Sequence, residues 1–266
     1  MPSVHFSNVS FAYSSAHRIL ADASFDLGPG WAGLVGANGA GKSTVLGLLS
    51  GDLAPDHGQV RSEPDGGVVL CEQRIDQLTP DIEAFAADWD GETSRLRSRL
   101  GLDPGDVDRW STLSPGERKR WQVGAALAGD PEVLLLDEPT NHLDVEARDL
   151  LVSVLERFNG CGVVVSHDRS VLDRLTSKTL RIHSGRISTW SAEYSTASQA
   201  WEQERAGLEA ERAKVKAERT AVRRELAAQR QAAAEKDARR IKERRTAGKH
   251  DPDTRGAAAT AKHAEG

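Results

Sequence analysis

The chain has 266 residues, of which 28% are charged, and a formal net charge of −5. No apolar run approaches the roughly 18 residues of a membrane span and no basic-then-apolar leader opens the sequence, so we expect a cytoplasmic protein. Residues 1–194 hold 18 Lys and Arg against 28 Asp and Glu, whereas residues 195–266 hold 17 against 12. An acidic body with a basic tail indicates that the tail, not the body, meets a polyanion. The lone cysteines, Cys71 and Cys161, lack metal-ligand spacing and are expected to be reduced core or near-core residues.

Residues 3–27 alternate between apolar and polar side chains, which predicts two short strands joined by a turn at residues 14–16. Tyr13 closes the first strand. Its ring could stack on the purine base of a nucleotide, which would favour ATP, or it could be a half-buried strand residue. The sequence supports both interpretations equally.

The stretch from Gly36 to Thr44 reads G-A-N-G-A-G-K-S-T and fits the phosphate-loop pattern. An apolar run before it predicts a buried strand, and the run after it has helical spacing. The glycines let backbone N–H groups and the helix N-terminus meet a phosphate chain. Lys42 would reach the outer phosphates and Ser43 would hold Mg²⁺. The predicted nucleotide site comprises Gly36, Ala37, Asn38, Gly39, Ala40, Gly41, Lys42, Ser43 and Thr44.

Two candidate elements follow the loop and its helix. A turn at residues 54–58 and another at 65–67 precede a short apolar strand, residues 68–71, which leads to Gln73. A glutamine just past a strand can accept a water or a metal ion with its amide oxygen, although most are solvated loop residues. Residues 81–110 are polar and only weakly helical.

The run L-S-P-G-E at residues 113–117 has the features of a helix start. Ser114 is a suitable cap, Pro115 suits the first turn and Glu117 is a capping-box partner. We expect the helix itself to run from residue 118 to 127. Taken alone, the run predicts a good helix N-terminus and no more.

Two buried strands carry the remaining candidates. The all-apolar run at residues 133–136 predicts a central parallel strand, and it ends in Asp137 and Glu138, where ligands bind in such sheets. Asp137 would hold Mg²⁺ and Glu138 would polarise a water. A helix over residues 145–158 leads to a second buried strand, residues 162–165. His167 follows that strand and could bond the outer phosphate, although a lone histidine more often satisfies its neighbours.

Strands alternate with helices from residue 31 to 194, which predicts an α/β fold built on a doubly wound parallel sheet. We expect the hairpin of residues 3–27 to be added at the edge of this sheet. A last hairpin at residues 179–190, with its turn at residues 184–185, closes the domain.

Phosphate loop, Gln73, L-S-P-G-E, L-L-L-D-E-P and S-H-D, in this order, resemble the nucleotide-binding domain of the ATP-binding cassette (ABC) superfamily over about residues 3–194. In that family ATP, with Mg²⁺, is sandwiched between two cassettes and hydrolysed. The resemblance implies six roles: adenine stacking by Tyr13, the Q-loop at Gln73, the signature segment at Ser114, Pro115, Gly116 and Glu117, the D-loop at Asp144, the catalytic base at Glu138 and the switch histidine at His167. It also implies Ser43, Gln73 and Asp137 as metal ligands.

D-E-P-T-N-H-L-D at residues 137–144 and S-H-D-R at residues 166–169 are similar to the ABC-F subfamily. That likeness implies a ribosome-acting translation factor or antibiotic-resistance protein, of which this chain would be the first cassette and part of the linker to a second. Two features depart from the family pattern. Pro115 replaces a glycine of the signature, and there is one cassette rather than two.

In the tail, residues 195–266, the stretch of roughly residues 196–246 reads as a long exposed helix, because that stretch lacks proline and is dense in Ala, Glu, Lys and Arg. Apolar residues recur every seven positions from Trp201 to Val222, a narrow seam that suits one antiparallel partner helix better than a strong coiled coil. Basic residues cluster at 239–245, before an expected turn at 248–252. In ABC-F proteins this tip lies near transfer RNA, which favours phosphate contacts over a solvated face.

Two other functions are compatible with a cassette. The chain could be the ATPase subunit of a membrane transporter, although residues 140–144 and the basic tail do not fit one. It could also be a non-catalytic RNA-binding helix on a degenerate cassette, against which Lys42, Asp137 and Glu138 argue because they are intact.

Overall fold

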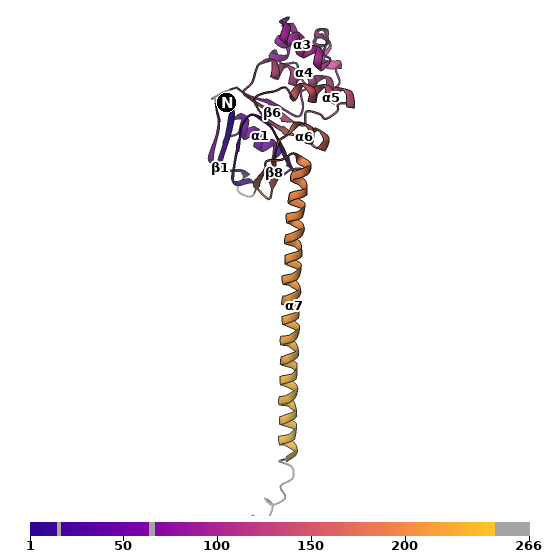
Figure 1. The fold of residues 1–266 in the computed structure, drawn as a ribbon. Helices are drawn as coiled ribbons and strands as arrows, with labels where there is room; N and C mark the ends of the chain where they lie inside the picture. The colour runs from indigo at the N-terminus through magenta and orange to yellow at the C-terminus, as the bar shows by residue number, and fades with distance from the viewer. Residues whose placement is uncertain (15–16, 64–66, 248–266) are drawn as a thin grey trace, which may run out of the picture. The chain divides into compact units, whose positions relative to one another are not determined.

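The computed structural model describes residues 1–14, 17–63 and 67–247 (Figure 1). The chain divides into two compact units, of which the first runs from Met1 to Trp201 and the second begins at Glu202. We refer to the first unit as the cassette.

A six-stranded sheet forms the centre of the cassette, in the order β5-β6-β7-β3-β8-β9. The strands are β3 (Gly30–Gly36), β5 (Val68–Cys71), β6 (Val133–Asp137), β7 (Cys161–Val165), β8 (Lys178–His183) and β9 (Arg186–Trp190). All neighbouring pairs are parallel except β8 and β9, which form the predicted closing hairpin. The predicted α/β fold with a parallel sheet is therefore confirmed.

The N-terminal hairpin does not join that sheet, contrary to our expectation. Strands β1 (Ser3–Ser14) and β2 (His17–Leu27) pair antiparallel, and a strand that was not predicted, β4 (His57–Glu63), pairs with the other side of β1. The three form a separate antiparallel sheet in the order β2-β1-β4. The predicted turn at residues 54–58 overlaps the start of β4. The sequence of β4 is mostly polar and does not predict a strand, which forms through pairing with β1. Residues 15–16, where the hairpin turn was expected, lie outside the described residues.

Central strand β6 shows how the core is divided. Leu135 packs into one apolar cluster with β1, β2 and α1 (Lys42–Ser50), whereas Leu134 and Leu136 pack into a second cluster on the other face. All three leucines are fully buried. A strand buried on both faces needs no polar alternation, which is why its sequence is uniformly apolar.

The remaining helices of the cassette cover the second cluster. They are α2 (Pro80–Ala87), α3 (Gly91–Leu100), the 3₁₀ helix η1 (Pro104–Thr112), α4 (Pro115–Ala128), α5 (Val145–Leu155) and α6 (Arg169–Leu175). In Figure 1, α3, α4 and α5 gather at one end of the cassette, away from β1. Helix α4 begins at Pro115, three residues before the predicted start, because proline occupies the first turn where no N–H is needed.

Helix α7 (Tyr194–Ala247) is continuous over 54 residues, and its first two turns belong to the cassette. Ala197 is buried, and the Trp201 ring meets Trp190 edge-on at 5.2 Å. The Arg181 guanidinium lies 4.8 Å from the centre of the Trp201 ring. The predicted turn at residues 248–252 lies outside the described residues. Within the described ranges, no helix combines the length and apolar character of a membrane span.

Candidate ATP-binding site

The phosphate loop joins the end of β3 to the start of α1. Gly41 has φ of 105°, and a Cβ atom there would lie 2.3 Å from the Ile19 Cγ2 atom. A Cβ on Gly36 would lie 2.9 Å from the Ile182 carbonyl oxygen. Both positions therefore require glycine, one for its conformation and its space and the other for its space alone.

Helix α1 begins at this loop with its N-terminus open to a ligand. Its cap residue is Gly41, no side chain caps it, and no acidic residue lies in its first turn. The first N–H groups of a helix have no partner within the helix, so they favour an anion. The Lys42 Nζ atom donates to the carbonyl oxygens of Gly36 and Ala37, at 3.1 and 3.3 Å. The ammonium thus lies against the loop, where phosphate oxygens could replace those carbonyls.

A serine–aspartate pair lies beside the loop. The Ser43 hydroxyl donates to Asp137 Oδ2 at 2.8 Å, although the two residues are 94 positions apart in the sequence. Asp137 is the last residue of β6 and is only 9% exposed. Hydroxyl and carboxylate oxygens are the donors that Mg²⁺ prefers, so this pair fits that ion. Gln73 is exposed and follows β5, the strand hydrogen-bonded to β6, by two residues.

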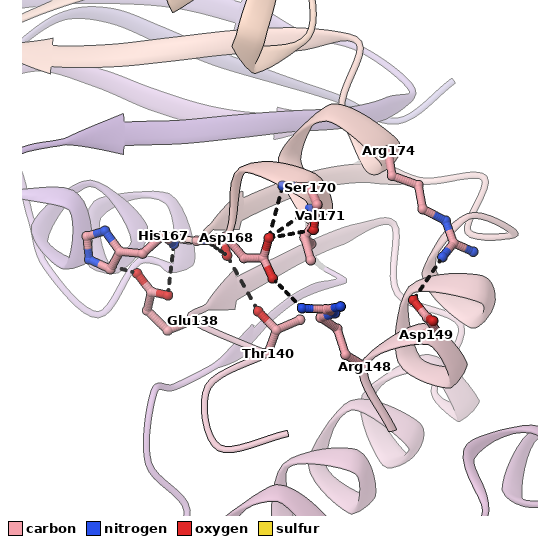
Figure 2. A network of polar contacts seen from close by, with 10 residues as sticks. Glu138, Thr140, Arg148, Asp149, His167, Asp168, Ser170, Val171 and Arg174 are labelled. Carbon is pink, nitrogen blue, oxygen red and sulfur yellow. Dashed lines mark hydrogen bonds and ion pairs between the residues drawn. The ribbon is translucent and has the colours of Figure 1, made fainter. Parts of the chain in front are cut away.

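Glu138 is the most unusual group at this edge of the sheet. It is 4% exposed and its φ is 50°, a left-handed conformation that non-glycine residues rarely adopt. Its Oε2 accepts a hydrogen bond from the His167 main-chain N–H at 3.2 Å. Its Oε1 lies 3.2 Å from His167 Nε2, a contact drawn in Figure 2 that is an ion pair only when the imidazole is protonated, and Oε1 accepts no hydrogen bond. One carboxylate oxygen is therefore buried without a hydrogen bond.

Burial is the main cause that raises the pKa of Glu138 above its ordinary 4.5, and the neighbouring Asp137 adds to it. The contacts with the His167 ring and main-chain N–H, and the positive charge of Lys42, oppose this increase. A carboxylate whose pKa is raised is a stronger base than an ordinary glutamate.

Asp168 braces the segment that carries His167. Its Oδ1 accepts hydrogen bonds from the Ser170 and Val171 N–H groups and so caps α6, and its Oδ2 pairs with Arg148 on α5 at 2.9 Å (Figure 2). Ser166 lies 3.5 Å from Thr140 between their hydroxyl oxygens. Sequence reasoning did not single out Asp168 or Arg148. An aspartate before a short helix could have suggested the cap, but nothing local indicated its ion-pair partner.

Tyr13 lies near the end of the phosphate loop. Its hydroxyl is 3.2 Å from the Thr44 hydroxyl, and its ring meets Phe11 edge-on at 5.0 Å. The residue lies on strand β1, as expected for a strand tyrosine, but it is 61% exposed rather than half-buried.

The signature segment forms the predicted helix cap. The Ser114 hydroxyl accepts from the Glu117 N–H at 3.2 Å, and the Glu117 carboxylate accepts from the Ser114 N–H at 2.7 Å. A Cβ on Gly116 would lie 2.7 Å from the His142 carbonyl oxygen, so this glycine packs directly on the loop that precedes α5. Asp144 ends that loop and caps α5 through the Ala147 N–H at 2.8 Å.

A cavity of about 240 Å³ adjoins the phosphate loop on the side of α6 and the start of α7. Its polar lining is basic and includes Lys42, His167, Arg169 and Arg181. Its aromatic wall is made of Tyr194 and Trp201. Arg169, two residues after His167, and the first two turns of α7 therefore line the same cavity.

Comparison with known proteins shows what the chain is similar to. The ABC transporter family model matches residues 20–141. GCN20 of Saccharomyces cerevisiae is 33% identical over 184 residues, which cover 65% of this chain and 24% of that protein. The ribosome protection protein VmlR of Bacillus subtilis is 34% identical over 162 residues, covering 61% of this chain and 28% of VmlR. The tylosin resistance ATP-binding protein TlrC of Streptomyces fradiae is 35% identical over 222 residues, covering 64% and 40%.

The chain thus matches between about a quarter and two fifths of the length of these relatives. Among solved structures, an ATP-binding subunit of an ABC transporter has a TM-score of 0.59 at 19% identity, over 71% of this chain and 89% of that one. A bacterial Atm1-family ABC exporter with ATP bound also has a TM-score of 0.59, at 23% identity, over 70% and 38%. At these identities the two structures support the fold alone. Residues 20–141 therefore match the ABC transporter family model, the structure has the fold of an ABC cassette, and the relatives that the chain matches are of the ABC-F type.

Proposed function

We propose that the cassette binds ATP with Mg²⁺ and hydrolyses it, and that the protein acts on the ribosome. The observation that carries the first part is the arrangement at the end of β6. The Ser43–Asp137 pair provides oxygen ligands for the metal, and the adjacent Glu138 keeps a buried carboxylate oxygen without a donor.

In this proposal the phosphate loop and the open N-terminus of α1 bind the phosphate chain. Lys42 exchanges its carbonyl partners for the outer phosphates, and the exposed Tyr13 ring stacks on adenine. Mg²⁺, held by Ser43 and Asp137 with Gln73, would neutralise charge that develops on the transferred phosphoryl group. The ligand set is hard and oxygen-only, as this ion requires.

Glu138 is the proposed base. Its Oε1 is free to accept a hydrogen bond from an attacking water, while Oε2 is held by the His167 segment. His167, whose side chain is 60% exposed, remains free to turn towards the outer phosphate. The carboxylate thus combines a fixed orientation with one free acceptor, which is what general-base catalysis needs.

We further propose that a second cassette completes the site. The signature segment, Ser114–Glu117, would meet the ATP of the partner with the N-terminus of α4, and Asp144 would lie at the same interface. The Ser114 hydroxyl is already engaged in the helix cap, and Pro115 has no N–H, so this N-terminus offers fewer donors than a glycine-rich one. The partner cassette can be in the same, longer chain or in a second copy.

Action on the ribosome rests on two supports. VmlR is named a ribosome protection protein and TlrC a tylosin resistance protein, and both match the cassette. The tail carries a net positive charge, with Arg and Lys gathered at residues 239–245 of α7. We propose that residues 195–266 form a linker whose basic end contacts RNA phosphates, and that the protein is cytoplasmic.

Glu138→Gln tests the chemistry. The variant should bind ATP with unchanged affinity while turnover falls by roughly 10²–10⁴, the usual contribution of a general base. Lys42→Ala should instead weaken binding itself. Turnover of Glu138→Gln at the parental rate, in a preparation free of contaminating ATPase, would remove Glu138 from this role.

Two further experiments test the partners. Turnover per chain should rise with protein concentration, or on addition of a second cassette; a constant specific rate over a wide dilution range with no dimer by light scattering would exclude the shared site. For the ribosome, cosedimentation across a salt series should weaken when Arg240, Arg244 and Arg245 are changed to Gln. Copurification with a membrane permease and no ribosome association would favour a transporter subunit instead.

A further inference from the structure

Helix α4 carries a buried charged side chain that the proposed chemistry does not use. Lys119 is 3% exposed. Its Nζ atom donates to the main-chain carbonyl oxygen of Glu72 and to Gln122 Oε1, the latter at 2.9 Å. In the part of the chain that the structure describes, its ammonium forms no ion pair, so its closest partners are neutral oxygens.

The first of these partners, the Glu72 carbonyl, lies beside a proposed metal ligand. Glu72 follows the last residue of β5 and directly precedes Gln73. Lys119 lies on the same helix as the signature segment, five residues after Ser114. A single side chain therefore joins the signature helix to the main chain beside the proposed metal ligand.

Burying an ammonium at this position costs desolvation free energy. Burial lowers the pKa of Lys119, and the nearby carboxylates of Asp137 and Glu72 oppose that effect without cancelling it. An apolar side chain of similar length would fill the same volume without desolvating a charge. What the charge adds is a strong hydrogen bond that fixes one carbonyl of an otherwise irregular segment, whose residues Glu72 and Gln73 are both exposed.

We propose that Lys119 is a positioning residue that holds the Glu72 carbonyl and thereby places Gln73 for the metal and the attacking water. Because Lys119 moves with α4, it also links the signature segment to Gln73. This inference rests on the proposed ATP site and deepens it. Lys119 itself touches neither the metal nor the nucleotide.

Lys119→Met tests the proposal, since it keeps the length of the side chain and removes the donor. Groups that orient metal ligands typically affect metal affinity by about 10-fold or more, so the Mg²⁺ concentration for half-maximal nucleotide binding should rise by about that factor. It can be measured without turnover from the Mg²⁺ dependence of fluorescent ATP-analogue binding. Binding of the analogue without Mg²⁺ should be unchanged.

Arg120→Met is the matched control. Arg120 is on the same helix and also donates to main-chain carbonyls, those of Leu100 and Gly101, but these lie far from Gln73 in the chain. Its loss should leave the Mg²⁺ dependence unchanged. Hydrogen exchange of the peptide around Glu72 should accelerate in Lys119→Met and not in Arg120→Met.

A double-mutant cycle with Gln73→Ala separates positioning from general destabilisation. If Lys119 acts through Gln73, Lys119→Met should have little further effect on Mg²⁺ dependence in the Gln73→Ala background. Additive effects, or an unchanged Mg²⁺ dependence in Lys119→Met, would overturn the proposal. If Gln73→Ala alone leaves Mg²⁺ dependence unchanged, Gln73 is not a metal ligand and the inference falls, while the Glu138 and Lys42 tests of the proposed function still stand. Should Lys119→Met fail to fold, Lys119→Leu, which also removes the donor, is measured in its place against the same criteria.

Discussion

Asp168 connects the segment that carries His167 to α5, and its replacement should lower the free energy of unfolding by an amount that follows from its contacts. Asp168→Asn keeps a side-chain oxygen for the α6 cap but removes the charge that pairs with Arg148, whose side chain is 29% exposed against 28% for Asp168. A partly exposed pair of this kind contributes about 0.5–1 kcal/mol. Asp168→Ala also removes the cap, worth about 0.5–2 kcal/mol, so it should lower the free energy of unfolding by about 1–3 kcal/mol in total.

The pH of the measurement follows from the pKa of Asp168. Burial tends to raise this pKa, but hydrogen bonds from Ser170 and Val171 and the charge of Arg148 outweigh it and lower the pKa below 3.8. A carboxylate with a lowered folded-state pKa stabilises the fold fully above its unfolded value and loses this effect as pH falls through the folded value. The full difference between variants is therefore expected at pH 7.

Urea unfolding followed by tryptophan fluorescence provides the assay. All six tryptophans lie between Trp31 and Trp201, so the signal reports on the cassette. For a domain of this size, the loss in Asp168→Ala corresponds to a fall in Tm of about 2–4 °C per kcal/mol. Equal losses in Asp168→Asn and Asp168→Ala would show that the cap contributes nothing. Additivity of Asp168→Asn with Arg148→Met would show that the ion pair does not stabilise the fold.

Three other predictions follow from the geometry. Because the pKa of Glu138 is raised by burial, the folded chain holds a proton there at pH values where the unfolded chain has released it. The contribution of Glu138 to the free energy of unfolding should therefore fall as pH rises from 4.5 through the folded-state pKa. In urea unfolding, the free energy of unfolding of Glu138→Gln should decline less over this pH range than that of the parent, and an identical pH profile would contradict this. Gly41→Ala should lower the free energy of unfolding by at least the roughly 1–3 kcal/mol of a strained backbone and should weaken ATP binding. Gly39→Ala, with φ of 76° but open space around its Cβ, should lower the free energy of unfolding by less. Equal losses of stability in thermal unfolding would refute the steric argument. Burial raises the pKa of Cys71 to about 12 and of Cys161 to about 11, so neither thiol should react with a disulfide reagent at pH 8 until the protein is unfolded, and rapid labelling of the native chain would disagree with their burial.

Local patterns explain why much of the fold was predictable from the sequence. The uniformly apolar β6 and β7 and the glycine-rich loop between β3 and α1 are each defined by neighbouring residues, as are the capping box at Ser114 and the closing hairpin. Helix α7 was predicted for the same reason, from the absence of proline and the dense helix formers. The candidate site residues were found because motifs mark the ends of these elements.

What the sequence alone determined about this protein is therefore the set of elements and the residues at their ligand-facing ends. Only the tertiary structure decided which distant segments meet. It paired β4 with β1 in a separate sheet, placed Ser43 against Asp137 across 94 positions, and buried Lys119 against the carbonyl of Glu72. The physical reason is that hydrogen bonds and ion pairs between remote segments depend on tertiary packing, which the local hydrophobic periodicity of the sequence does not determine. The sequence pattern of an exposed charge and that of a buried one can be identical until the chain is folded.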